Sequence, residues 1–148
     1  MATSTSDFDH PVDPSEGWQA EHVARYVATN GAEGHIWNGV PTLLLTTRGR
    51  RTGIARRIAL IYGRYGESYV VVASKGGSPA HPHWYLNLTA DPRVRVQVAA
   101  DVFDATARTA TPEEKTQLWP QMVQLFPRYA EYQAATDREI PLVILTRA

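Results

Sequence analysis

Cysteine is absent from the 148 residues of the chain. Disulfide bonds, thiolate nucleophiles and metal sites built on cysteine are therefore excluded, and the composition suits a reducing compartment. Long apolar runs are also missing, since none approaches the roughly 20 residues that a membrane-spanning helix requires. The polar, acidic first segment, MATSTSDFDHPVDPSEG, does not have the pattern of a signal peptide. These absences predict a cytoplasmic protein without a membrane span.

The chain also has no net charge at pH 7, because 15 Lys and Arg residues balance 15 Asp and Glu residues. Proteins that bind nucleic acid usually carry a broad basic excess, so we expect no nucleic-acid partner. The five histidines are scattered, and the pair His81 and His83 has no third ligand at metal spacing. The phosphate-binding G-x-x-x-x-G-K-[ST] pattern does not occur. We predict no metal site, and any positively charged site must be local.

Apolar periodicity predicts one domain over residues 14–148, after a disordered tail at residues 1–13 whose polar side chains bury little. A first helix is expected between a cap at Asp13 and a stop at Asn30-Gly31. Further helices are expected at residues 83–89, 111–126 and 127–135, and strands at residues 42–47, 57–62, 68–74, 93–98, 102–109 and 140–146. The almost wholly apolar run 68–74 is predicted to be central. This pattern indicates a mostly antiparallel α+β domain, such as a small barrel.

Positive charge is concentrated in one turn, TTRGRRTGIARR, which contains Arg48, Arg50, Arg51, Arg56 and Arg57. The planar guanidinium group binds phosphate and carboxylate through paired hydrogen bonds. Arg56 and Arg57 are neighbours on a predicted strand, so at most one of them faces a given ligand. The turn is interpreted either as an anion site or as a solvated hairpin tip whose arginines meet scattered acids.

A second segment that suits an anion follows the run 68–74. Ser74 and Lys75 supply a hydroxyl and a cation, and the glycines Gly76 and Gly77 allow a ligand to approach the backbone. Pro82 opens a helix whose first N–H groups face outward. The alternative is an ordinary strand–loop–helix connection, but two such segments in one small domain favour a shared ligand.

The third cluster, WPQMVQLFPRYAEYQ, contains Trp119, Met122, Phe126, Tyr129 and Tyr132 near helical spacing. Such a stripe is typical of a helix packed on the core. Tyr129 and Tyr132 follow the break at Pro127 and carry hydroxyls, so they are also candidates to line a pocket and donate a hydrogen bond or a proton to a substrate oxygen.

These motifs occur in a fixed order: LLLTTRGRRTG, VVVASKGG, HPHWYLNL with DPRVRVQV, TPEEKTQLWPQM, and the two tyrosines before DREIPLVIL. From about Gly39 to the C-terminus the chain thereby resembles the deazaflavin-dependent nitroreductases. Those enzymes use reduced coenzyme F-420 and have a fold related to the FMN-binding, pyridoxamine-phosphate-oxidase-like proteins. The resemblance implies an α+β split β-barrel of about six mostly antiparallel strands with flanking helices.

The resemblance also implies residue roles. The phosphodiester and glutamate tail of the coenzyme would meet Arg50, Arg51, Thr52 and Arg56. The deazaflavin ring and its linker would be bordered by Ala73, Ser74, Lys75, Gly76 and Gly77, with Pro82, Trp84 and Tyr85 behind that wall. The catalytic residues, which would hydrogen-bond the substrate and relay a proton, would be Ser74, Tyr129 and Tyr132. Phe126 stands where such enzymes commonly have tyrosine, which leaves the substrate range open.

The implied function is an oxidoreductase that transfers a hydride from reduced coenzyme F-420 to a quinone, nitroaromatic or enone. One alternative is the same barrel using FMN, although a single phosphate would leave most of the arginine turn unused. Another is a non-catalytic carrier of the deazaflavin. The sequence leaves monomer and homodimer open. For the helix at residues 15–29 it leaves open a lid or packing role and a weak peripheral membrane contact.

Overall fold

A computed structural model describes residues 6–148 of the protein, with side chains from Phe8 onward. Its helical elements are α1 (Ser6–Asp9), α2 (Gly17–Ala28), the 3-10 turn η1 (Lys75–Gly77), α3 (His83–Ala90), α4 (Pro112–Leu125) and α5 (Arg128–Ala134). Its strands are β1 (Ile36–Trp37), β2 (Val40–Arg48), β3 (Ala55–Ile61), β4 (Gly63–Tyr65), β5 (Ser68–Val72), β6 (Arg93–Val98), β7 (Asp101–Thr109) and β8 (Leu142–Arg147). No helix in this part of the chain is long and apolar enough to cross a membrane.

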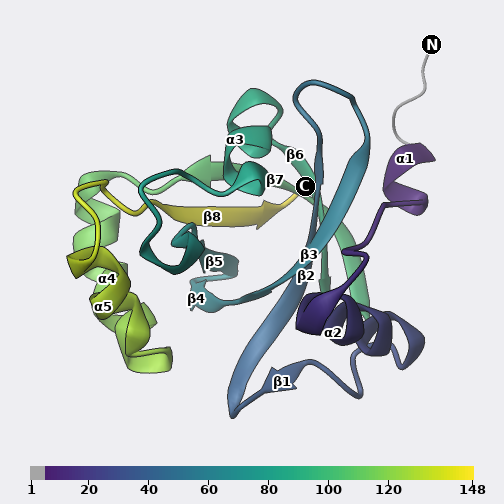
Figure 1. Cartoon of the computed structure of the whole chain (residues 1–148), viewed down its shortest axis with the longest axis horizontal. Helices are drawn as coiled ribbons and strands as arrows, with labels where there is room; N and C mark the ends of the chain where they lie inside the picture. The colour runs from purple at the N-terminus through teal and green to yellow at the C-terminus, as the bar shows by residue number, and fades with distance from the viewer. Residues whose placement is uncertain (1–5) are drawn as a thin grey trace.

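The strands form one curled antiparallel sheet, with α2 at one end of the view in Figure 1 and α4 and α5 at the other. The strand order is β1-β2-β6-β7-β8-β5-β4, and β3 pairs with β2 outside this path. β3 and β4 follow one another in the chain, yet β3 pairs with β2 whereas β4 pairs with β5. The sheet is therefore open between β3 and β4, which makes it a split β-barrel and confirms the predicted fold class.

The six predicted strands are all present within a few residues of their expected bounds. The short strands β1 and β4 were not predicted, because two or three residues carry no readable alternation. The sequence also predicts a central position for the run 68–74, and this is wrong. β5 lies next to the end of the path, between β8 and β4, and the middle of the sheet is β6, β7 and β8.

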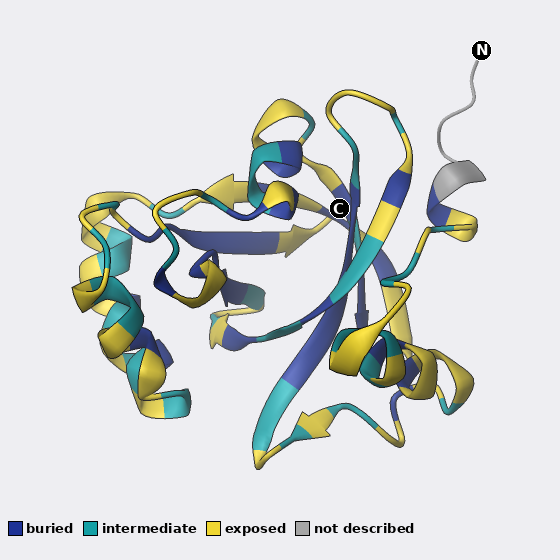
Figure 2. Ribbon diagram, in the orientation of Figure 1, coloured by how far each residue is buried: buried dark blue, intermediate teal, exposed yellow. Residues whose placement is uncertain are grey.

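Burial on both faces explains why β5 is so apolar. Val71 points into the barrel interior, together with Leu43, Val96 and Leu145. Val70 and Val72 point the other way, into a second cluster formed with α4 and α5. Figure 2 shows most of β5 and of the neighbouring β8 coloured as buried. The apolar sequence of β5 therefore reflects burial on both faces of the sheet and not a central position in the strand order.

Residues 6–13 differ from the predicted disordered tail, while residues 1–5 lie outside the described part of the chain. Phe8 is buried beneath the guanidinium of Arg48, whose central carbon lies 4.4 Å from the ring centre. Val12 pairs alongside β3 in an isolated parallel bridge, since its N–H donates to Ala55 O and its carbonyl accepts from Arg57 N. These contacts are with residues more than 30 positions away, so the local polar composition gave no sign of them.

The predicted cap of the first helix is also wrong. Asp13 accepts two hydrogen bonds from the Arg57 guanidinium, at 2.7 and 2.8 Å. α2 begins only at Gly17, after Glu16, and no side chain caps it. By contrast, α4 starts with the predicted capping box, in which Thr111 accepts from Glu114 N and the Glu114 carboxylate accepts from Thr111 N.

Candidate functional site

A cleft of about 570 Å³ lies at the open side of the barrel. One wall is β3, and the opposite wall comprises the end of β5, the loop that contains η1, and α5. The predicted site residues that line it are Arg56, Ser74, Lys75, Gly76, Pro82, Trp84, Tyr129 and Tyr132. The fold thus brings together residues from three of the sequence segments that were singled out separately.

Three arginines of the turn have protein partners. Arg57 is held by Asp13, and Arg48 forms an ion pair with Asp91 at 3.5 Å. The Arg50 guanidinium donates to Asn87 Oδ1 at 2.9 Å, and its backbone N–H donates to the same oxygen at 3.2 Å. These contacts fasten the β2–β3 hairpin to α3 and to the N-terminal segment. Of the two interpretations of the turn, these three arginines therefore fit the second, in which arginines bind polar side chains of the protein itself and not a ligand.

The other two arginines, Arg51 and Arg56, are exposed, and no ion pair or side-chain hydrogen bond joins them to another described residue. Arg56 lines the cleft, and Arg51 lies beyond it at the hairpin tip. Thr52 shapes that tip, because its hydroxyl accepts from Ile54 N at 3.1 Å. The positive charge left for a ligand therefore follows β3 from the cleft outward to the tip.

The loop after β5 has an unusual backbone. Lys75, Gly76 and Gly77 have φ values of 46°, 62° and 82°, all in the left-handed region. This conformation is costly for a residue with a Cβ such as Lys75. It places Ser74, Lys75 and Gly76 against the cleft, whereas the predicted residues Ala73 and Gly77 are buried behind it.

Gly77 is required by close packing as well as by its φ. A Cβ at this position would lie 2.8 Å from Tyr132 O and 3.0 Å from Tyr132 Cα. The loop and the backbone of α5 therefore touch directly, and this contact sets the position of the loop relative to Tyr132 within one wall of the cleft.

Of the three residues predicted around α3, Pro82 and Trp84 line the cleft and Tyr85 does not. The Tyr85 hydroxyl shares a hydrogen bond with Thr109 Oγ1 at 2.8 Å, and its ring faces a second cavity beside α4. The predicted support by Tyr85 is therefore indirect, through its edge contact with Trp84, whose ring centre is 6.4 Å away.

Tyr129 and Tyr132 lie on α5 with ring centres 6.3 Å apart, and both line the cleft. No hydrogen bond joins either hydroxyl to another residue between positions 8 and 148. Burial, and to a lesser extent the charge of Tyr132, raises the pKa of Tyr129 well above its ordinary value. Tyr129 thus remains protonated at neutral pH and can donate a hydrogen bond to a substrate oxygen.

The N-terminal part of the chain supplies a rim of the cleft, through the helix for which the sequence left open a lid or packing role. The Trp18 ring of α2 stacks on the Trp37 ring, with 5.5 Å between the ring centres. The Trp37 ring centre in turn lies 6.2 Å from that of Phe126. The Gln19 side chain pairs with both the N–H and the carbonyl of Ala59, so it covers the edge of β3 as a further strand would. Val23 and Tyr26 are fully buried against the sheet. These contacts support the packing role for α2.

The lining suits a planar, uncharged ring joined to an anionic chain. Ile58, Leu60 and Trp84 supply apolar walls, and Ser74 and Tyr132 supply hydroxyls. The cations Arg56 and Lys75 lie at the same cleft. Among the described residues there is no group of three or more His, Asp or Glu that could hold a metal ion. Arg56 and Lys75 are side-chain cations of the kind that bind phosphate and carboxylate groups.

Comparison with known proteins matches the chain over nearly its whole length. A family model described as F420H(2)-dependent quinone reductase covers residues 18–147. The F420H(2)-dependent quinone reductase Rv1261c of Mycobacterium tuberculosis is 44% identical over 131 residues, which are 85% of this chain and 87% of that protein. The solved structure of an F420-H2 dependent reductase (FDR-A) is 44% identical, with a TM-score of 0.66 over 71% of this chain and 93% of that one. Another, described as a domain-swapped dimer, is 40% identical, with a TM-score of 0.69 over 84% of this chain and 94% of that one.

Proposed function

Because the chain belongs to the F420H(2)-dependent quinone reductase family, we propose that it transfers a hydride from reduced coenzyme F-420 to a quinone. The observation that carries this function is the cleft itself. It joins the hydroxyls of Ser74, Tyr129 and Tyr132 to Arg56 and, beyond it at the hairpin tip, Arg51, two cations that form no ion pair with another residue in the described part of the chain. The coenzyme, when bound, supplies the hydride, and the protein supplies binding, orientation and polarity.

Coenzyme binding is assigned to residues on both sides of the cleft: the β2–β3 hairpin on one side, and the loop after β5 with α3 on the other. Arg51 and Arg56 hold the anionic tail, since their guanidinium groups are exposed and form no ion pair with an acid among the described residues. The loop with Lys75 and Gly76 borders the ring, and Pro82 and Trp84 form the wall behind it. Arg50 and Thr52 act indirectly, because their polar groups already stabilise the hairpin that carries Arg51.

Hydride transfer to a quinone leaves a negatively charged oxygen that must take up one proton. Tyr132 and Tyr129 present hydroxyl donors to that oxygen from α5, and Ser74 lines the same cleft from the loop. Donors fixed in place before the reaction stabilise such a charge without reorganising. The aromatic rim of Trp18, Trp37 and Phe126 keeps the reaction away from bulk water. Phe126 has no hydroxyl, so it contributes area and no further donor.

The proposal also covers further electron acceptors, the cellular location and the oligomeric state. Nitroaromatics and enones are further electron-poor acceptors that would meet the same donors. We propose a cytoplasmic location, in keeping with the cysteine-free sequence. Light scattering of the purified protein distinguishes the monomer from the homodimer.

The test is a side-by-side fluorescence titration of the purified protein with oxidised coenzyme F-420 and with FMN, followed by turnover with a soluble quinone. Selective deazaflavin binding and quinone-dependent oxidation of the reduced coenzyme are expected. Selective FMN binding would overturn the cofactor and the roles of Arg51 and Arg56. Tight deazaflavin binding without oxidation by any quinone would identify a carrier instead of an enzyme.

A further inference from the structure

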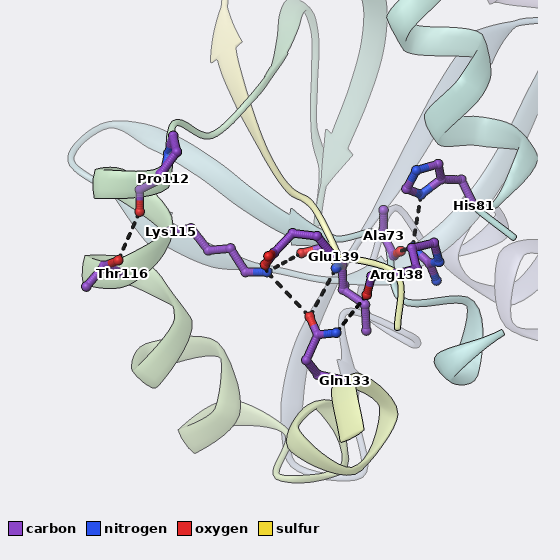
Figure 3. Close-up of polar contacts among 9 residues, drawn as sticks. Ala73, His81, Pro112, Lys115, Thr116, Gln133, Arg138 and Glu139 are labelled. Atoms are coloured by element: carbon purple, nitrogen blue, oxygen red, sulfur yellow. Dashed lines mark hydrogen bonds and ion pairs between the residues drawn. The ribbon is translucent and has the colours of Figure 1, made fainter. Parts of the chain in front are cut away.

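Arg138 lies between α5 and β8, outside the cleft, and its side chain is directed entirely at the loop after β5. Its guanidinium donates to the carbonyls of Ala73 and Ser78 at 3.0 Å and of Ser74 at 2.7 Å. It also donates to His81 Nδ1 at 2.9 Å. Figure 3 shows Arg138 between the backbone at Ala73 and the ring of His81. One side chain therefore holds both ends of the turn that contains η1.

The turn needs such support because its conformation is strained. Lys75 has a φ of 46°, which is unfavourable for a residue other than glycine. Strained conformations persist only where the surrounding structure over-determines them. A guanidinium group is suited to this task, because its planar fork presents five N–H donors at once, whereas an ammonium group cannot reach several carbonyls in one plane.

Arg138 is itself fixed from the side of the helices. Gln133 of α5 donates to Arg138 O at 2.7 Å and accepts from Ile140 N at 3.0 Å. Lys115 of α4 donates to Ile140 O at 2.6 Å and forms an ion pair with Glu139. Figure 3 shows these contacts converging on the segment that carries Arg138. The same helix α5 carries Tyr129 and Tyr132, so Arg138 relates the loop to the two tyrosines, which lie on the same wall of the cleft.

We infer that Arg138 is a positioning residue for the coenzyme-facing loop: it sets the backbone that places Ser74, Lys75 and Gly76 at the cleft, without lining the cleft itself. The inference rests on the proposed function and gives a role to a residue that lies in the DREIPLVIL motif but does not line the cleft. Its effect acts through the loop, so it should appear first in coenzyme affinity and much less in the KM for the quinone.

The experiment compares Arg138→Ala and Arg138→Lys with Arg128→Ala, which removes an exposed arginine from α5. Coenzyme affinity is measured by fluorescence titration well below the melting temperature of each variant. We expect Arg138→Ala to raise the Kd for oxidised coenzyme F-420 by about 10- to 100-fold, by analogy with the loss seen when a group that orients a metal ligand is removed. Arg138→Lys should recover only part of the affinity, and Arg128→Ala should bind as the wild type does.

Rescue by a small molecule separates positioning from general stability. Millimolar guanidinium chloride, far below denaturing concentrations, should restore affinity to Arg138→Ala, whereas the same concentration of sodium chloride should not. A stability control is Gly66→Ala, at a strained but open turn whose glycine does not line the cleft, which should lower the melting temperature and leave the Kd unchanged.

Each outcome decides the inference. A folded Arg138→Ala variant with wild-type affinity overturns it, as does an affinity loss that Gly66→Ala shares. If Arg138→Ala does not fold, the same comparison is made with Arg138→Lys, and wild-type affinity there overturns it equally. A wild-type protein that fails to bind coenzyme F-420 overturns the proposed function as well, so the two failures are distinguishable.

Discussion

The contact between Gly77 and α5 gives a sharp test of how the cleft is held. We predict that Gly77→Ala destabilises the protein and lowers turnover together. A Cβ at this position would lie 2.8 Å from Tyr132 O and 3.0 Å from Tyr132 Cα. Both atoms belong to the backbone, so neither can swing away as a side-chain end would. The matched control is Gly66→Ala, where φ is 60° and no atom lies within 4 Å of the new Cβ.

The magnitude follows from two terms. An alanine in the left-handed region costs about 1–2 kcal/mol, and this applies to both variants. Forcing extra volume into a packed site costs about 1–3 kcal/mol more, and this applies to Gly77 alone. The gain from restricting the unfolded chain, about 0.4–1 kcal/mol, is common to both and cancels. For a chain of this size the difference corresponds to a melting temperature about 3–10 °C lower for Gly77→Ala than for Gly66→Ala.

The assay is thermal unfolding of both variants beside the wild type, followed by steady-state turnover at a temperature where all three are folded. Because Tyr132 must shift when the new methyl group is accommodated, kcat should fall at least about tenfold in Gly77→Ala. Equal melting temperatures for the two variants, or a destabilised Gly77→Ala with wild-type kcat, would refute the idea that this contact positions the loop relative to Tyr132.

Three further predictions concern single side chains of the site. Arg51→Ala should raise the Kd for the coenzyme more at low salt than at high salt, because an exposed charge is screened; titrations at two ionic strengths check this, and equal affinity would remove Arg51 from the site. Tyr132→Phe should lower kcat more than coenzyme affinity, and unchanged turnover would exclude its hydroxyl from the reaction. Burial, and secondarily the charge of Arg138, lowers the pKa of His81 below its ordinary value of 6.5. The unfolded chain therefore binds a proton that the native state does not, and stability should decrease as pH falls below 6.5. His81→Asn, which keeps an acceptor for Arg138, should reduce this slope in urea unfolding curves, and an identical slope would contradict the assignment.

Local patterns in the sequence were sufficient for most elements. Strict alternation located β6 at residues 93–98, and the spacing of Thr111 and Glu114 located the start of α4. Both signals depend on neighbours within four positions, so they survive without knowledge of the fold. The same reasoning failed at residues 6–13, where order comes from contacts with β2 and β3.

The candidate site divides in the same way. The sequence by itself determined which residue types were available: an arginine turn, a glycine loop after an apolar strand, and two tyrosines beyond a proline. Only the tertiary structure decided their use. It engaged Arg48, Arg50 and Arg57 within the protein and placed Arg51 and Arg56 where a ligand can reach them. It also brought Arg138 to three carbonyls that lie 60 to 65 positions earlier in the chain. The physical reason is that charge pairing and hydrogen bonding act over a few ångströms in space, and strand pairing determines which distant residues come within that range.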